Sequence, residues 1–252
     1  MTKRVLLPWE INHLRKYGFT DIDINEIGTT PVEYITGHAE FLGHDLLVTP
    51  DVLIPRIETE KIVDISVDLL NRFPPKNPVI LADVGCGSGA LGIVLADRLK
   101  KQGCHFHLYL SDISKEALQI TRTNIDRLLP HSKDTITVLR SDLLGSFPHD
   151  VTIDGLVSNL PYIPSKRIAK LDSSVKDHEP HQALDGGPDG TLLINKLLDR
   201  VAGFIRPAPT SFLILEIDSL HQVQDFHIPD GFIAKIQKDD FGKNRYLLLK
   251  KG

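Results

Sequence analysis

Hydrophobic residues along this chain follow two alternating patterns from residue 58 onward. Apolar positions three or four residues apart predict amphipathic helices over 58–73, 90–100, 114–129 and 191–205. Short, continuous apolar runs predict strands over 79–84, 105–111, 136–139, 156–158, 212–217, 233–237 and 246–249. Pro74 and Pro75 are expected to end the first helix. Strands that alternate with such helices predict an α/β fold with a mostly parallel sheet, to which the last strand pair adds an antiparallel strand.

The region before this alternation is less regular. Residues 1–33 mix polar and apolar positions, enough for one or two short helices but too few for an independent core. Residues 34–55 contain short apolar stretches interrupted by glycine and proline, which predict a hairpin and a connecting loop. The sequence therefore predicts a short N-terminal helical segment over 1–33, a hairpin linker over 34–55 and one large domain over 56–252.

Composition narrows the class of protein without indicating its chemistry. The chain has 252 residues, a formal net charge of −4 and 41% hydrophobic residues, which is ordinary for a globular protein. Two cysteines, Cys86 and Cys104, exclude a disulfide framework and fit a reducing compartment. No apolar run approaches the roughly 20 residues of a membrane span, and the N-terminus does not resemble a signal peptide. We therefore expect a cytoplasmic protein with no membrane partner.

Glycine and polar residues gather just after the predicted strands. Ligands of parallel sheets bind outside the carboxyl ends of the strands, so these positions are candidates for a binding site. The first strand runs into a glycine-rich loop that opens into a helix: Gly85, Cys86, Gly87, Ser88 and Gly89. Closely spaced glycines let the backbone approach a ligand, and a helix N-terminus presents free N–H groups. The spacing differs from the G-x-G-x-x-G pattern of dinucleotide-binding folds.

The second and third predicted strands each end at a serine followed by an aspartate. Asp112 follows Ser111, where a carboxylate in nucleotide-binding folds contacts ribose hydroxyls. Asp142 and Leu143 follow Ser141, and a side-chain acceptor beside an apolar platform is suited to a purine ring. Together with the glycine loop, these residues predict a cofactor site.

The fourth strand ends at Asn159, Leu160, Pro161 and Tyr162, the segment that indicates the chemistry. A planar amide nitrogen is a poor nucleophile because its lone pair is conjugated. The Asn159 side-chain oxygen and the Leu160 carbonyl could accept its two hydrogens, orient it and favour the charge that develops on it. Pro161 restricts Leu160 to an extended conformation, and Tyr162 offers a flat wall for a planar group. We expect all four residues to be catalytic and to bind the substrate.

The glycine loop, the strand-end acids and this tetrapeptide together resemble the class I S-adenosylmethionine-dependent methyltransferases, in the branch that methylates conjugated amino groups. The resemblance implies a Rossmann-like sheet, S-adenosylmethionine as cofactor and S-adenosylhomocysteine as product. It implies that the donor is bound by residues 85–89, Asp112, Asp142, Leu143 and Asn159.

Flanking segments resemble one family of that branch, the release-factor glutamine N5-methyltransferases. Its motifs are similar to residues 31–60, 179–190, 215–217 and 239–245. The resemblance implies transfer of a methyl group to the glutamine amide in the Gly-Gly-Gln motif of peptide chain release factors, a role in translation termination. The family usually has proline at the positions of Leu160 and Ile57, and a longer N-terminal helical domain than the one expected here.

Other functions remain open from the residues. Asn-Leu-Pro-Tyr is also typical of ribosomal RNA adenine dimethyltransferases, and residues 235–252 are basic, so an adenine-N6 methyltransferase acting on RNA or DNA is one alternative. A glutamine methyltransferase acting on a ribosomal protein and a non-catalytic binding module are others. The net charge of −4 favours a protein substrate over nucleic acid. His105 and His107 share one strand face without a matching ligand cluster, so no metal is expected.

Overall fold

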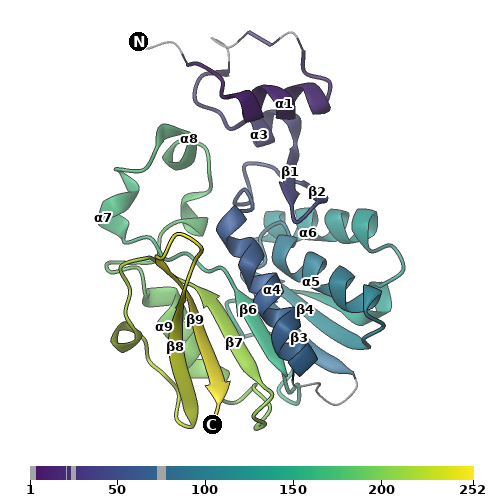
Figure 1. Cartoon of the computed structure of the whole chain (residues 1–252), viewed down its shortest axis with the longest axis vertical. Helices are drawn as coiled ribbons and strands as arrows, with labels where there is room; N and C mark the ends of the chain where they lie inside the picture. Colours follow the sequence, from purple (N-terminus) through teal and green to yellow (C-terminus); the bar gives the residue numbers. More distant parts are fainter. Residues whose placement is uncertain (1–3, 21, 24–26, 73–77) are drawn as a thin grey trace.

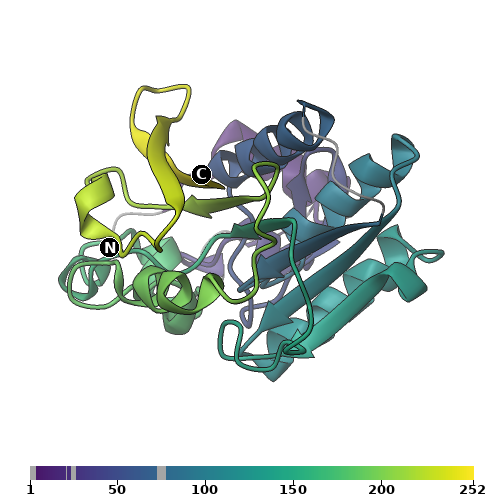
Figure 2. The same cartoon turned by 90° about the horizontal axis from the view of Figure 1, so that it is seen from below.

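The computed structural model describes residues 4–20, 22–23, 27–72 and 78–252 and contains a seven-stranded sheet (Figures 1 and 2). The strands lie in the order β5 (Ile136–Arg140), β4 (Phe106–Asp112), β3 (Val79–Val84), β6 (Gly155–Ser158), β7 (Phe212–Glu216), β9 (Asn244–Lys251) and β8 (Phe232–Lys238). Neighbouring strands from β5 to β7 are parallel, and β9 is antiparallel to both of its neighbours. The predicted α/β fold, a Rossmann-like sheet with an antiparallel C-terminal strand, is confirmed.

Helices cover both faces of the sheet and form two hydrophobic cores. The principal helices are α4 (Ile57–Arg72), α5 (Ala90–Lys101), α6 (Lys115–Leu128) and α9 (Leu192–Val201). One core joins α4, α5 and α6 to the sheet, through residues such as Ile62, Ile93 and Leu118. The other joins α9 to the opposite face, through Ile194 and Leu197. Because both faces are covered, the central strands are buried and the free space for a ligand lies at their ends.

Local sequence signals explain where these helices begin. The Ser114 hydroxyl caps α6 by accepting a hydrogen bond of 3.0 Å from the Ala117 N–H group, a role for which serine is a favoured residue. Helix α5 follows Gly89, whose φ of 84° lies in the left-handed region. The predicted end of the first helix at Phe73 and the stop at Pro74 and Pro75 lie outside the described residues.

The predicted helix over 191–205 is too long at its C-terminal end. Helix α9 stops at Val201, because the chain after it hydrogen-bonds to Ile153 instead of continuing the helix. The Ile153 N–H group donates to the Phe204 carbonyl, and the Arg206 N–H group donates to the Ile153 carbonyl. Short helices were also missed because four or fewer residues carry no helical period: α7 (Ser165–Ile168), α8 (Ser173–Lys176), η1 (Lys133–Thr135), η2 (His181–Ala183) and η3 (Val223–Asp225).

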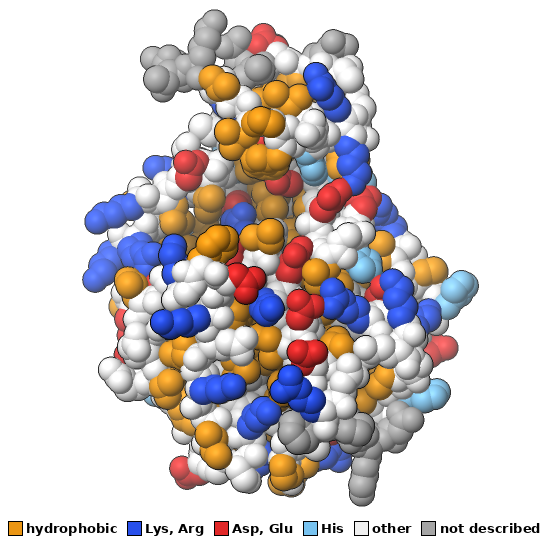
Figure 3. Space-filling model, viewed as in Figure 1, with side chains coloured by type: hydrophobic (Ala, Val, Ile, Leu, Met, Phe, Trp, Pro, Cys, Tyr) orange, Lys and Arg blue, Asp and Glu red, His pale blue; other side chains and the backbone are white. Residues whose placement is uncertain are grey.

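The N-terminal region stands above the sheet in Figure 1 and connects to it through a hairpin. It contains α1 (Pro8–Lys16), α3 (Val32–Thr36), β1 (His38–Phe41) and β2 (His44–Leu47). Strands β1 and β2 pair antiparallel, so the hairpin expected within 34–55 is present. On the face drawn in Figure 3, a hollow lined partly by hydrophobic side chains separates this region from the rest of the molecule.

One buried side chain connects the hairpin to the loop after β3. Asn124 on α6 is fully buried, and its Oδ1 accepts a hydrogen bond of 2.8 Å from the Leu47 N–H group. Its Nδ2 donates to the carbonyls of Leu47 and Ser88, at 3.0 and 2.9 Å. The carboxamide therefore fixes β2, α6 and the glycine-rich loop relative to one another.

Replacing Asn124 with alanine is expected to lower the free energy of unfolding by about 2 kcal/mol, because the buried Ser88 carbonyl and the partly buried backbone groups of Leu47 lose their partners. Chemical denaturation measures this change. Thr123→Ala is the matched control, since Thr123 is the exposed neighbour on the same helix and bonds only to its own helix backbone. A loss below about 0.5 kcal/mol for Asn124→Ala, the range of ordinary surface changes, contradicts this assignment.

Candidate functional site

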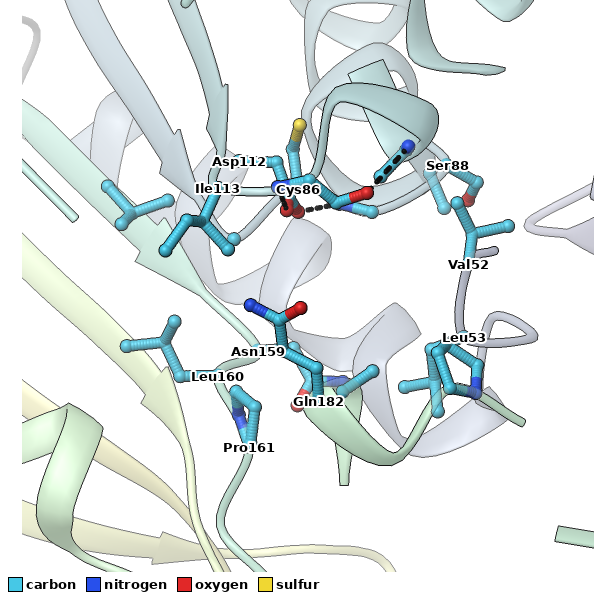
Figure 4. Close-up of a pocket in the computed structure, with 18 of the residues that line it drawn as sticks. Val52, Leu53, Cys86, Ser88, Asp112, Ile113, Asn159, Leu160, Pro161 and Gln182 are labelled. Carbon is cyan, nitrogen blue, oxygen red and sulfur yellow. Dashed lines mark hydrogen bonds between the residues drawn. The ribbon is translucent and has the colours of Figure 1, made fainter. Parts of the chain in front are cut away.

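A cavity of about 400 Å³ lies at the carboxyl ends of β3, β4, β5 and β6, where the sequence predicts a site. All but two of the predicted site residues line it: Gly85, Cys86, Gly87, Ser88, Asp112, Asp142, Leu143, Asn159, Leu160 and Pro161. In Figure 4, Asn159 points into the open space across from Cys86 and Asp112. The two predicted residues outside this lining are Gly89 and Tyr162.

The glycine loop is held by the strand beside it. The N–H groups of Gly85 and Cys86 donate to the Ser111 carbonyl at 2.8 and 2.9 Å, and the Gly87 N–H group donates to Asp112 Oδ2 at 2.9 Å. The other Asp112 oxygen accepts from the Ser114 N–H group at 2.9 Å. Asp112 thus joins the loop after β3 to the turn after β4. Because these loop N–H groups are already used, the loop is not a free cradle for a phosphate.

Gly89 packs behind the lining of the cavity, where a larger residue would not fit. A Cβ atom there would lie 2.8 Å from the Ile93 side chain and 3.1 Å from the Thr121 methyl group. The Thr121 hydroxyl donates to the Gly87 carbonyl at 2.7 Å and lies 3.6 Å from the Cys86 sulfur. Burial raises the pKa of Cys86, so this thiol stays protonated and is no nucleophile.

Two carboxyl groups, the buried Asp83 and the partly buried Asp112, give the cavity wall its electrostatic character. Asp83, at the end of β3, is 1% exposed and accepts a hydrogen bond of 2.9 Å from the Gly92 N–H group. Burial and, to a smaller extent, the nearby Asp112 raise the pKa of Asp83 to about 7, against the hydrogen bond from the Gly92 N–H group. Burial likewise raises the pKa of Asp112, against the hydrogen bonds from Ser114 and Gly87. A positively charged ligand would stabilise the ionised form of both carboxyl groups. This wall of the cavity therefore favours a cationic ligand and disfavours a phosphate.

The turn after β5 places a leucine in an unusual backbone conformation. Leu143 has a φ of 55°, in the left-handed region that disfavours residues other than glycine. The turn is held by hydrogen bonds from the Gly145 N–H group to the Asp142 carbonyl and from the Ser146 N–H group to the Ser141 hydroxyl. Leu143 lines the cavity and gives it an apolar surface. Strained backbone conformations such as this positive φ are commonly found at ligand sites.

The tetrapeptide presents two free acceptors to the cavity. Asn159 Nδ2 donates to the Thr59 hydroxyl at 2.9 Å, which leaves Oδ1 on the other side of the amide. Neither Asn159 Oδ1 nor the Leu160 carbonyl oxygen accepts a hydrogen bond from any residue that the structure describes. The Leu160 side chain is buried against the loop, where a Cβ atom on Gly85 would lie 2.9 Å from it. The φ of Gly85 is 75°. Glycine therefore suits position 85 because it tolerates a positive φ and because it has no Cβ atom to meet Leu160.

Tyr162 does not line the cavity, although the sequence predicts that it does. Its hydroxyl, which is partly buried, donates to Glu216 Oε1 at 2.9 Å. Burial and Glu216 both raise the pKa of Tyr162, so the hydroxyl stays protonated. The backbone of the tetrapeptide is supported by the loop at 185–190, where a Cβ atom on Gly186 would lie 2.7 Å from the Pro161 oxygen. The tyrosine therefore anchors the tetrapeptide.

Several residues near the cavity were not predicted as site residues. Arg56 lines it and forms an ion pair with Glu179 at 2.5 Å, whose side chain is 1% exposed. Burial raises the pKa of Glu179, and Arg56 opposes that shift. Asp83 and Thr59 also line the cavity. Arg56, Thr59 and Glu179 lie in segments whose family resemblance was visible, but nothing in the local pattern shows how they pair.

Two further findings concern what the described part of the chain lacks. Within it, no group of three or more histidine, cysteine, aspartate or glutamate side chains is arranged to hold a metal ion. Its helices include none with the length and apolar character needed to cross a membrane.

Known proteins resemble this chain in sequence. The family model "Methyltransferase small domain" matches residues 58–175. The release factor glutamine methyltransferase of Moorella thermoacetica is 40% identical over 189 residues, covering 75% of this chain and 62% of that protein. The corresponding protein of Clostridium acetobutylicum is 31% identical over 245 residues, covering 96% and 82%. The chain spans less than two thirds of the length of the Moorella relative.

Solved structures share the fold at low sequence identity. A ribosomal protein L11 methylase from Lactobacillus delbrueckii subsp. bulgaricus has a TM-score of 0.53 and 18% identity, over 81% of this chain and 83% of that one. A putative methyltransferase from Escherichia coli has a TM-score of 0.55 and 12% identity, over 86% and 99%. These likenesses concern the fold alone. By sequence, the chain belongs to the release factor glutamine methyltransferase family.

Proposed function

We propose that this protein transfers a methyl group from S-adenosylmethionine to the side-chain amide nitrogen of the glutamine in the Gly-Gly-Gln motif of peptide chain release factors. The observation that carries the proposal is the pair of free acceptors, Asn159 Oδ1 and the Leu160 carbonyl, in a cavity that the carboxyl groups of Asp83 and Asp112 also line. Membership of the glutamine methyltransferase family supports the choice of substrate.

The residues around the cavity fit this cofactor. S-adenosylmethionine supplies an electrophilic methyl group on a positively charged sulfonium. Asp83 and Asp112 give the wall a negative character, and the Gly87 N–H group that could otherwise bind phosphate is held by Asp112. We assign the ribose contact to Asp112 and the purine surface to Asp142 and Leu143, at the ends of β4 and β5.

The chain's own groups prepare the substrate amide in three ways. Asn159 Oδ1 and the Leu160 carbonyl accept its two hydrogens, which aims the nitrogen and favours the positive charge that develops on it. Pro161 keeps Leu160 extended, and burial of the Leu160 side chain against Gly85 fixes that carbonyl. Holding the two reactants in one orientation supplies a large part of the rate without a metal or a covalent intermediate.

A nucleic-acid substrate is the second candidate. The exocyclic amino group of adenine is also a conjugated NH₂, so the same two acceptors fit it. On the face in Figure 3, Lys and Arg side chains gather on the side of α7, a helix that contains Lys166 and Arg167. The overall charge of −4 weighs against an extended nucleic-acid surface and favours the protein substrate.

Transfer of radiolabelled methyl groups tests the proposed function. The substrates to compare are a release factor, its Gly-Gly-Ala variant, a ribosomal protein fraction and structured ribosomal RNA. We expect label only on the unmodified release factor. Label on RNA that falls steeply with salt identifies the nucleic-acid alternative. Label on a ribosomal protein identifies a different glutamine substrate, and cofactor binding without transfer to any of them identifies a binding module.

The Asn159→Ala variant is expected to lower kcat with release factor by about 10²- to 10³-fold, the effect of removing one preorganised hydrogen-bond partner. Single-turnover kinetics measures the loss, and calorimetry with S-adenosylhomocysteine checks that the cavity still binds its ligand. Near-wild-type turnover contradicts amide capture by Asn159.

The affinity for S-adenosylmethionine is expected to rise about tenfold between pH 6 and pH 8, because the pKa of Asp83 is about 7 and a cation favours its ionised form. Binding therefore releases protons in this range, which calorimetry in buffers of different ionisation enthalpy detects. Asp83→Asn keeps an acceptor for the Gly92 N–H group but cannot titrate. The titration of the ligand's own amino group affects both proteins, so it cancels when the pH dependence of the Asp83→Asn affinity is subtracted from that of the wild type. An equal pH dependence in both proteins refutes this role for Asp83.

A further inference from the structure

A buried chain of hydrogen bonds connects Asn159 to residues on two other elements. Asn159 Nδ2 donates to Thr59 Oγ1 at 2.9 Å, and the Thr59 hydroxyl donates to Glu216 Oε2 at 2.6 Å. The Tyr162 hydroxyl donates to the other Glu216 oxygen at 2.9 Å. Thr59 lies on α4, Glu216 ends β7, and both are buried, at 5% and 1% exposure. The chain therefore joins α4, β7 and the tetrapeptide, and it begins in the lining of the cavity at Asn159 and Thr59.

We propose that Thr59 and Glu216 are positioning residues that set the orientation of the Asn159 amide, with its oxygen toward the cavity and its NH₂ group away from it. This inference rests on the proposed amide methylation. The role matters because the amide has two nearly equal-sized ends, of which only the oxygen can accept a hydrogen from a substrate NH₂ group.

The orientation follows from counting hydrogens. An ionised carboxylate only accepts hydrogen bonds, and Glu216 receives one on each oxygen, from Thr59 and from Tyr162. A threonine hydroxyl has a single hydrogen, so once that hydrogen is given to Glu216, Thr59 can offer Asn159 only a lone pair. Asn159 must then supply the hydrogen of its bond to Thr59, and only its NH₂ group can do so. Its oxygen is left to face the cavity.

The surroundings of Glu216 decide whether its carboxyl group is ionised. Burial raises the pKa of Glu216 and the nearby Glu58 adds to this shift, whereas the hydrogen bonds from Thr59 and Tyr162 and the charge of Arg245 favour the carboxylate. The Thr59 and Tyr162 hydroxyls each donate to one oxygen of this carboxylate, whereas a proton on Oε2 would turn the Thr59 hydroxyl toward Asn159 and reverse the amide. The ionised state of Glu216 therefore sets the direction of the hydrogen-bond chain and the orientation of the Asn159 amide.

Substitutions at Thr59 test the proposal without changing side-chain size. Thr59→Val removes the hydroxyl and keeps the shape, so the Asn159 amide is free to rotate, and kcat is expected to fall about 10- to 100-fold with KM for release factor nearly unchanged. Thr59→Ser restores the hydroxyl and is expected to return kcat to within about threefold of wild type. Ser66→Ala is the matched control, because Ser66 is buried on the same helix and bonds only to the Ile62 carbonyl.

A readout without substrate separates this proposal from the proposed function. The side-chain NH₂ resonance of Asn159, assigned by its loss in Asn159→Asp, is expected to show a rigid ¹⁵N relaxation signature in wild type, Thr59→Ser and Ser66→Ala. In Thr59→Val it is expected to become mobile. If the resonance behaves so but no substrate glutamine is methylated, the proposed function fails and the positioning role stands. An equally rigid amide in Thr59→Val, or equal kcat loss in Thr59→Val and Thr59→Ser, overturns the positioning role.

Discussion

The Asp112 carboxylate joins the two strand ends on which the cavity depends. One oxygen accepts from Gly87 in the loop after β3, and the other accepts from Ser114 at the start of α6. Because parallel strands end at one edge of the sheet, this single side chain fixes the distance between two loops that are far apart in the sequence. It also places negative charge beside Asp83, and that charge determines which ligands the cavity favours. Shape and electrostatics at this edge therefore have a common origin.

The reacting half of the site is assembled from a wider set of elements. The tetrapeptide follows β6, but Thr59 comes from α4 and Glu216 from β7, and the glycines of the loop at 185–190 allow that loop to pack on the tetrapeptide backbone. The acceptors of the site are thus held by packing on one side and by hydrogen bonds on the other. A loop alone would leave the Asn159 amide free to turn, whereas these contacts give it one orientation.

The sequence predicted the parts of the structure that depend on local signals. Strand and helix periods gave the sheet and its main helices, glycine and proline positions gave the hairpin, and the rule that ligands bind at strand ends located Asp112 and Asn159. It could not show that Tyr162 turns toward Glu216, because that pairing joins residues 54 positions apart. The same applies to Arg56 and Glu179, which are 123 positions apart. The predicted helix over 191–205 failed at its end for a related reason, the contact of its last residues with Ile153.

The most direct measurement is a crystal structure of the protein with S-adenosylhomocysteine and a release factor bound together. The account predicts the substrate glutamine in the cavity mouth, its two amide hydrogens on Asn159 Oδ1 and the Leu160 carbonyl at about 2.7–3.2 Å between heavy atoms. It also predicts the Asn159 NH₂ group on the Thr59 hydroxyl, unchanged from the free protein. A glutamine bound elsewhere, or an Asn159 side chain that presents its NH₂ group to the substrate, would contradict the account.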